Sequence, residues 1–207
     1  ILKQFHYAIR TVPENGNILF HDGDENIMSL IEMGCWSKTH KLGGEENIKL
    51  SMNDGVIHFK DQQFDVSDLP MHGQHNLNNV VMAIYTTYLH GIDPQKSFLA
   101  LKKSKGVKRR FETVFKHNEK IVIDDFAHHP TAISHTVEAA ISHFSSKKIV
   151  GIVELASNTM SQGHHGLELY NSASSLAQVY WLNLSNKKNQ NFEYDSINLL
   201  LEDLKKD

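Results

Sequence analysis

The stretch DDFAHHPTAI, residues 124–133, places two carboxylates and two imidazoles within a few positions of each other, directly after the apolar run IVI. Carboxylates accept hydrogen bonds from hydroxyl and N–H groups, and imidazoles exchange protons near neutral pH. In open α/β sheets, ligands bind beyond the carboxyl ends of strands, and helix N-termini favour anions. The stretch therefore fits a ligand-binding loop, although Asp125 could equally cap a simple turn.

Two other stretches carry side chains suited to a nucleotide. The stretch GQHNLNN places Asn76 and Asn79 three residues apart at the predicted start of a helix, so we expect both to project from one side. Amides offer a donor and an acceptor, which matches the edge of an adenine. The stretch GVKRRFE contains Arg109 and Arg110, and a planar guanidinium can clamp phosphate. Each stretch also has an ordinary interpretation, a helix cap for the amides and a solvated face for the arginines.

The first part of the chain is predicted to mix strands and helices. Apolar residues alternate in some segments and recur at helical spacing in others. We expect a strand at 17–20, followed by a helix that begins after Asp24, ends at Gly34 and turns Ile27, Leu30 and Ile31 inward. A hairpin is expected over 55–68. A second helix is expected to begin at residue 75 and end at Gly91, with Leu77, Val80, Val81, Ile84 and Leu89 inward, and a third to run from Pro94 to about Lys103 with Asp93 as its cap.

The pattern changes after Gly106, and we place a domain boundary between residues 108 and 109. We expect two strands, at 109–115 and 120–126, joined by a turn, and then a helix over 131–144 with Ala132, Thr136, Ala139 and Ala140 inward. A buried strand at 148–154, a helix over 167–177 and a second buried strand at 178–184 are expected to follow. From residue 120 onward this order is β-α-β-α-β, which predicts an α/β, Rossmann-like domain with a parallel sheet.

Composition excludes several classes of protein. The chain has 207 residues, 40% of them hydrophobic, and a formal net charge of −3. This balance gives no basic face for nucleic acid, and no apolar run approaches the roughly 18 residues that cross a bilayer. Cys35 is the only cysteine, so an internal disulfide is excluded. We therefore expect a cytoplasmic protein without nucleic-acid or membrane partners.

In this order and spacing, HNxxN, RRFE and DDFAHHPTA resemble the Mur ligase family, the ATP-dependent enzymes that join amino acids or peptides to UDP-N-acetylmuramic acid. The stretches FAHHPTAI, QFHYAIRTVPENGNI, MGCW and SNTM favour the members that attach a murein peptide during peptidoglycan recycling. Members that attach L-alanine, whose loop typically reads YGHHPTE, are the alternative. The resemblance covers nearly the whole chain.

The resemblance implies the later part of a central ATP-binding domain at 1–108 and a C-terminal Rossmann-like domain, truncated, at 109–207. It also implies ATP and magnesium, UDP-N-acetylmuramate and murein peptide as substrates, and an acyl-phosphate intermediate. No GxxGKT phosphate loop occurs in the sequence. We therefore expect a fragment that is inactive alone and that needs the missing N-terminal and central-domain segments, which would carry the magnesium ligands.

The resemblance further implies a nucleotide site shared by both domains and completed when they close. It places Asp125 on the ribose and Arg110 on the nucleotide. The family's loop before SNTM commonly reads EPRS, whereas here Ala156 stands in place of the arginine. The implied ATP contacts are His75, Asn76, Asn79, Arg110 and Asp125, and the implied substrate contacts or loop supports are Asp124, His128, Ser157, Asn158 and Thr159.

A binding module of another class, holding a nucleotide or a metal without catalysis, remains the alternative to a ligase. A metal would have to use the histidine pairs His128–His129 and His164–His165. Adjacent histidines point in diverging directions, and neither pair has the i, i+4 spacing or nearby cysteines of a zinc site. We therefore predict no metal site in this chain.

Overall fold

The computed structural model describes residues 1–43, 48–51, 55–184 and 194–205. The chain forms two compact units. The first comprises Ile1–Pro70 and His75–Gly106, and the second comprises Met71–Gln74 and Val107–Asp207. The chain thus enters the second unit briefly at residues 71–74 before it leaves the first unit after Gly106. Within the described residues, no helix combines the length and apolar character needed to cross a membrane.

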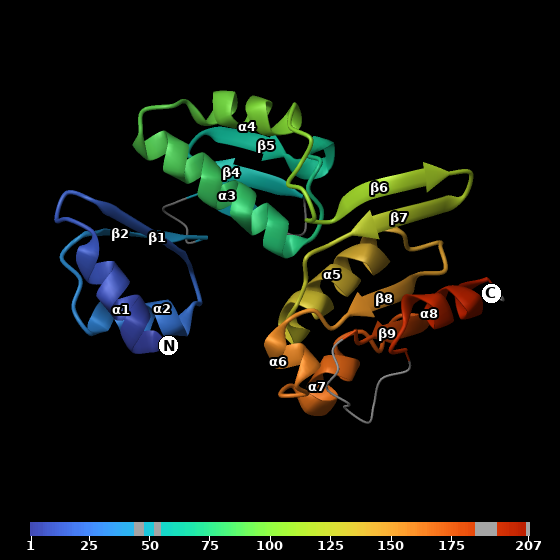
Figure 1. Ribbon diagram of the computed structural model, residues 1–207. Coiled ribbons are helices and arrows are strands. Elements are labelled where there is room, and N and C mark those ends of the chain that lie inside the picture. The colour runs from blue at the N-terminus through green and yellow to red at the C-terminus, as the bar shows by residue number, and fades with distance from the viewer. Residues whose placement is uncertain (44–47, 52–54, 185–193, 206–207) are drawn as a thin grey trace. The chain divides into compact units, whose positions relative to one another are not determined.

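The described part of the first unit contains two small sheets with helices beside them (Figure 1). Strands β1 and β2 pair in parallel, and β3, β4 and β5 form an antiparallel sheet. The elements in chain order are α1 (Leu2–Thr11), β1 (Asn17–His21), α2 (Glu25–Glu32), β2 (Lys38–Leu42), β3 (Lys49–Ser51), β4 (Val56–Phe59), β5 (Gln62–Asp65), the 3-10 helix η1 (Val66–Asp68), α3 (Gln74–Leu89) and α4 (Pro94–Lys102).

Local signals in the sequence set the helix ends of this unit. The Asp24 side chain accepts a hydrogen bond from the Ile27 N–H at 3.1 Å, and Asp93 caps α4 in the same way. Gly91 follows α3 with a φ of 79°, a left-handed conformation that favours glycine. The predicted caps and stops are therefore confirmed. Of the predicted inward face of α3, Val80, Val81 and Ile84 are buried, whereas Leu77 and Leu89 are half-buried.

Among its described residues, the second unit also contains two separate two-stranded sheets. Its elements are β6 (Glu112–His117), β7 (Lys120–Asp124), α5 (Pro130–His143), β8 (Val150–Glu154), α6 (Asn158–Ser161), α7 (Gly166–Asn171), β9 (Gln178–Leu182) and α8 (Ile197–Leu204). The predicted mixture of strands and helices is confirmed, and β8 and β9 pair in parallel as expected. Strand β7, however, pairs antiparallel with β6 rather than with the parallel strands of the described chain. The turn at Asn118, with a φ of 51°, lets the neighbouring strand pair with β7.

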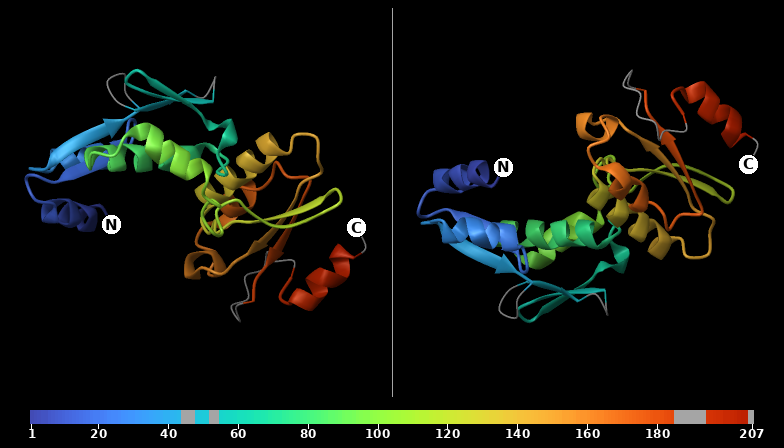
Figure 2. Two further views of the ribbon diagram at one scale, coloured as in Figure 1. Left: turned by 90° about the horizontal axis from the view of Figure 1, so that it is seen from above. Right: turned by 90° about the horizontal axis from the view of Figure 1, so that it is seen from below.

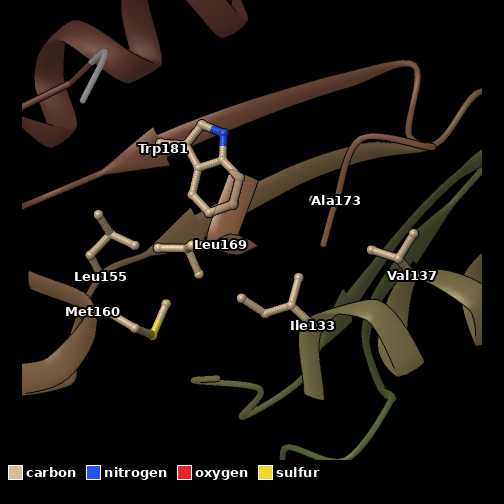
Figure 3. Close-up of a cluster of buried hydrophobic side chains, with 7 residues drawn as sticks. All are labelled: Ile133, Val137, Leu155, Met160, Leu169, Ala173 and Trp181. Carbon is tan, nitrogen blue, oxygen red and sulfur yellow. The ribbon is translucent and has the colours of Figure 1, made fainter. Parts of the chain in front are cut away.

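The core of the second unit lies between α5 and the β8–β9 sheet (Figure 3). Its buried side chains are Ile133, Val137, Leu155, Met160, Leu169, Ala173 and Trp181. The predicted inward face of α5 is therefore wrong in part: Ala139 is buried, but Ala132, Thr136 and Ala140 are half-buried. Because larger apolar side chains bury more area, Ile133 and Val137 set the rotation of the helix.

Residues 148–154 were predicted to form a buried strand; the strand is present as β8, but its predicted burial is wrong. In β8, Val150 is 39% exposed and Ile152 is 55% exposed. Ile152 pairs with Tyr180, so both side chains lie on one face of the sheet. Helix α8 lies beside β9 and packs over Tyr180, which leaves the β8 half of this face open (Figures 1 and 2).

Residues 71–74 belong to the packing of the second unit through His72. The His72 ring lies 4.1 Å from the His143 ring and 5.8 Å from the buried Phe111 ring, measured between centroids. Burial lowers the pKa of His72, and the neighbouring His143 lowers it further. A segment distant in sequence thus completes the aromatic cluster at the end of α5.

Candidate functional site

Asp125 is a hydrogen-bonded junction between two loops of the second unit. Its Oδ2 accepts from the Phe111 N–H at 2.8 Å, and its Oδ1 accepts from the Ala127 N–H at 2.9 Å. The carboxylate therefore ties the turn before β6 to the loop after β7. Because an ionised carboxylate has about four acceptor positions, each oxygen can still accept a hydrogen bond from a ligand.

Asp124, the last residue of β7, has a different partner. Its Oδ2 lies 3.3 Å from Nε of Arg109, and both side chains are partly exposed. Successive strand residues point to opposite faces, which explains why the adjacent carboxylates bind separate groups. Such an exposed ion pair is worth at most about 1 kcal/mol.

The turn before β6 holds Arg110 between two unusual backbone conformations. Arg109 has a φ of 57° and Phe111 a φ of 54°, and a left-handed conformation costs a non-glycine residue roughly 1–2 kcal/mol. Arg110 itself is exposed. Within the described residues, no hydrogen bond or ion pair engages its guanidinium group. The Arg110 guanidinium is thus available to an anionic ligand.

The two histidines of the loop face different groups. His128 is exposed, and its Nδ1 lies 2.8 Å from the Phe126 carbonyl oxygen, to which it donates. His129 caps α5 by accepting from the Thr131 N–H at 3.3 Å. Its ring also meets the edge of the His165 ring at 4.7 Å. The described residues contain no group of three or more histidine, cysteine or acidic side chains able to hold a metal ion.

The SNTM stretch follows β8 and begins α6. Ser157 caps this helix by accepting from the Met160 N–H at 3.2 Å, and Met160 is fully buried. Asn158 and Thr159 are exposed, as is Ala156. The stretch therefore combines a structural cap with two exposed polar side chains at the carboxyl end of a strand.

In the first unit, the two amides at the start of α3 differ in exposure. Asn76 is 6% exposed, whereas Asn79 is exposed and His75 is half-buried. Asn76 lies four residues before Val80, on the buried stripe of the helix. Of the two amides, Asn79 therefore presents its side chain at the surface.

A hollow that was not predicted lies at the carboxyl ends of the parallel strands β1 and β2. It encloses about 190 Å³ and is lined by His21, Asp22, Leu42, Gly43, Lys49, Asn78 and Val81. A hydrogen bond from Lys41 lowers the pKa of Asp22, and burial lowers the pKa of His21. The signal was present in HDGD, which begins at the last residue of β1 as DDF begins at the last residue of β7.

Comparison with known proteins bears on both units. A family model described as "Mur ligase, glutamate ligase domain" matches residues 109–191. The UDP-N-acetylmuramate–L-alanyl-γ-D-glutamyl-meso-2,6-diaminoheptandioate ligase of Escherichia coli K12 is 31% identical over 169 residues, which are 79% of this chain and 37% of that protein. The chain belongs to the Mur ligase family.

Other relatives agree with this membership. The ligase of the same name from Haemophilus influenzae is 33% identical over 80% of this chain and 38% of its own length. The crystal structure of a murein peptide ligase from Psychrobacter arcticus is 29% identical, with a TM-score of 0.63, over 87% of this chain and 40% of that one. The predicted α/β fold class is thereby confirmed. This Mur ligase chain spans less than two-fifths of the length of the two curated relatives.

Proposed function

We propose that this chain is the nucleotide- and peptide-binding portion of an ATP-dependent ligase that joins a murein peptide to UDP-N-acetylmuramate. The observation that carries the proposal is the likeness to the E. coli ligase, which extends over 79% of the chain. That ligase is named for its action on UDP-N-acetylmuramate and the peptide L-alanyl-γ-D-glutamyl-meso-2,6-diaminoheptandioate. The exposed polar groups after β7 and β8 give the proposal a physical site.

ATP would supply the phosphoryl group that activates the carboxylate of UDP-N-acetylmuramate, and the peptide amine would then displace phosphate from the acyl phosphate. The chain's residues serve to bind and orient. The exposed Arg110 guanidinium is suited to the anionic nucleotide, and the remaining acceptor positions of Asp125 are suited to ribose hydroxyls. We assign the adenine edge to Asn79, because its amide is exposed, with His75 beside it.

The other polar residues of the site serve the loops. Asn76, being buried, stabilises the start of α3. Asp124 and Ser157 hold their loops through the contacts described above. His128, Asn158 and Thr159 are exposed and are assigned to the peptide substrate. Magnesium is assigned to none of the described residues, since they form no cluster suited to a metal ion.

An exchange of segments tests this function directly. The chain replaces the matching segment of the E. coli ligase, and formation of UDP-N-acetylmuramyl tripeptide is measured with ATP, UDP-N-acetylmuramate and the tripeptide. We expect product with the tripeptide, because the peptide-binding loops come from this chain. The 207-residue chain alone gives the background, and we expect no turnover from it, because its sequence contains no GxxGKT phosphate loop.

The same exchange with the matching Haemophilus influenzae segment is the control for the junction. If that control is active and the exchange with this chain makes no product with either tripeptide or L-alanine, the ligase function is wrong. Product with L-alanine in place of the tripeptide would instead assign the chain to the ligases that attach L-alanine. The Asn79→Ala variant of the active exchange should raise the KM for ATP and leave the KM for the tripeptide unchanged.

A further inference from the structure

The adjacent arginines of the turn before β6 differ in what holds them. The Arg109 guanidinium is fixed from two directions: its Nε lies 3.3 Å from the Asp124 carboxylate, and its Cζ lies 4.7 Å from the centre of the Phe126 ring. The Arg110 guanidinium has neither kind of contact within the described residues. One arginine is thus part of the scaffold, and its neighbour is presented to solvent.

The backbone of Arg109 is held as firmly as its side chain. Its N–H donates to Oε2 of Glu112 at 2.8 Å, and its carbonyl oxygen accepts from the Phe126 N–H at 2.9 Å. These contacts retain the left-handed φ of 57° at Arg109. Phe126 therefore supports Arg109 twice, through its ring and through its N–H.

The residue on the other side of Arg110 is held independently. Phe111 also has a left-handed φ, of 54°, and its N–H donates to the Asp125 carboxylate. Its side chain is buried, at 5% exposed. Both neighbours of Arg110 are therefore fixed, each by a different one of the two adjacent carboxylates, Asp124 and Asp125.

We propose that Arg109 is a positioning residue that fixes the backbone of Arg110 and so directs the Arg110 side chain toward the nucleotide. This role rests on the proposed contact between Arg110 and the nucleotide. A guanidinium binds phosphate oxygens through two parallel N–H donors, so its orientation affects affinity. Holding the backbone in the bound geometry beforehand lowers the ordering cost of binding.

The chemistry of Arg109 makes the role specific to arginine. Lysine would keep the positive charge, but it has no Nε donor at that position and no planar group to stack on Phe126. Arg109→Lys should therefore loosen the turn while it preserves the net charge. Lys108→Ala is the matched control, because Lys108 is an exposed cation of the same turn and is outside the network described above.

Two measurements on the 207-residue chain test the proposal. Amide hydrogen exchange reports on the turn: Arg109→Lys should speed exchange at Phe111 roughly tenfold, because the turn opens locally, and Lys108→Ala should not. Titration with ATP, followed by NMR, reports on binding. Arg109→Lys should weaken ATP binding by about threefold to tenfold, since the ordering cost returns.

A double-mutant cycle separates positioning from a general structural effect. If Arg109 acts through Arg110, Arg109→Lys should have no further effect on ATP affinity in the Arg110→Ala background. An equal loss in both backgrounds, or no loss in either, would overturn the positioning role while leaving the ligase function intact. An Arg110→Ala variant with unchanged ATP affinity, or an unaltered chain that does not bind ATP, would overturn the nucleotide contact and the positioning role with it. The segment exchange tests the ligase function separately.

Discussion

The start of α3 in the first unit and the loop after β7 in the second unit place polar side chains by different means. In α3, the 3.6-residue repeat decides exposure residue by residue, which buries Asn76 and exposes Asn79. In the loop after β7, the Asp125 carboxylate accepts hydrogen bonds from two backbone N–H groups, and these bonds set the loop conformation. A polar residue in a helix is thus interpreted from its position in the repeat, and one in a loop from its partners.

The largest effect on stability should come from removing the Asp125 carboxylate. Asp125→Ala leaves the Phe111 and Ala127 N–H groups without their acceptor, and we expect a loss of roughly 2–4 kcal/mol in the free energy of unfolding. Asp124→Ala removes an exposed ion pair and should cost less than about 1 kcal/mol. Urea denaturation of both variants measures the difference. Equal losses would show that the loop does not depend on Asp125 in the way that the contacts indicate.

The α3 amides should give an intermediate effect. Asn76→Ala removes a buried polar side chain and should lower the free energy of unfolding by about 1–2 kcal/mol. Asn79→Ala is the matched change on the exposed side and should stay within about 0.5 kcal/mol of the unaltered chain. Thermal or urea unfolding measures both values. A larger loss for Asn79→Ala would contradict the burial difference on which the comparison rests.

The smallest effect should be a pH dependence in the first unit. His40 lies between Asn17, whose Oδ1 is 2.7 Å from Nε2, and Tyr85, whose hydroxyl is 3.1 Å from Nδ1. Burial, and then the charge of Lys38, lower the pKa of His40 from its ordinary 6.5. The unfolded chain therefore binds the proton more readily than the folded chain. The stability that neutral His40 contributes is thus complete above about pH 6.5 and is lost as the pH falls through the lowered pKa.

His40→Gln keeps a polar side chain but cannot titrate. It should reduce the slope of unfolding free energy against pH between neutral and mildly acidic conditions. Part of the slope should remain, because His21 and His72 also have lowered pKa values. An unchanged slope in His40→Gln would mean that the neutral bridge between Asn17 and Tyr85 contributes nothing to the pH dependence.

The sequence predicted the features that depend on near neighbours. The caps at Asp24 and Asp93 and the hairpin turn at Asn118 were found because each is decided within a few residues. The exposure of Ile152 was not predicted, because it depends on the position of α8, which begins about 45 residues later. The pairing of β7 with β6 in place of a parallel partner is likewise a choice between competing strands, which periodicity does not decide.

The same limit applied to the candidate site. Residue types identified the arginine pair and the carboxylate pair, but only the structure shows that Arg109 is held by Asp124 and Phe126 while Arg110 is exposed. The burial of Asn76 was recoverable from its i, i+4 relation to Val80, had that stripe been extended to the first turn of the helix.

Residues 71–74 belong to the second unit, so the boundary between the two units is not a single point in the sequence. The chain passes between the units after Pro70, after Gln74 and after Gly106. A protein cut between Gly106 and Val107 would leave behind the His72 ring that packs against Phe111 and His143. An exchange of the second unit that keeps this packing therefore has to start upstream of Met71. Such an exchange also includes residues 75–106, which belong to the first unit.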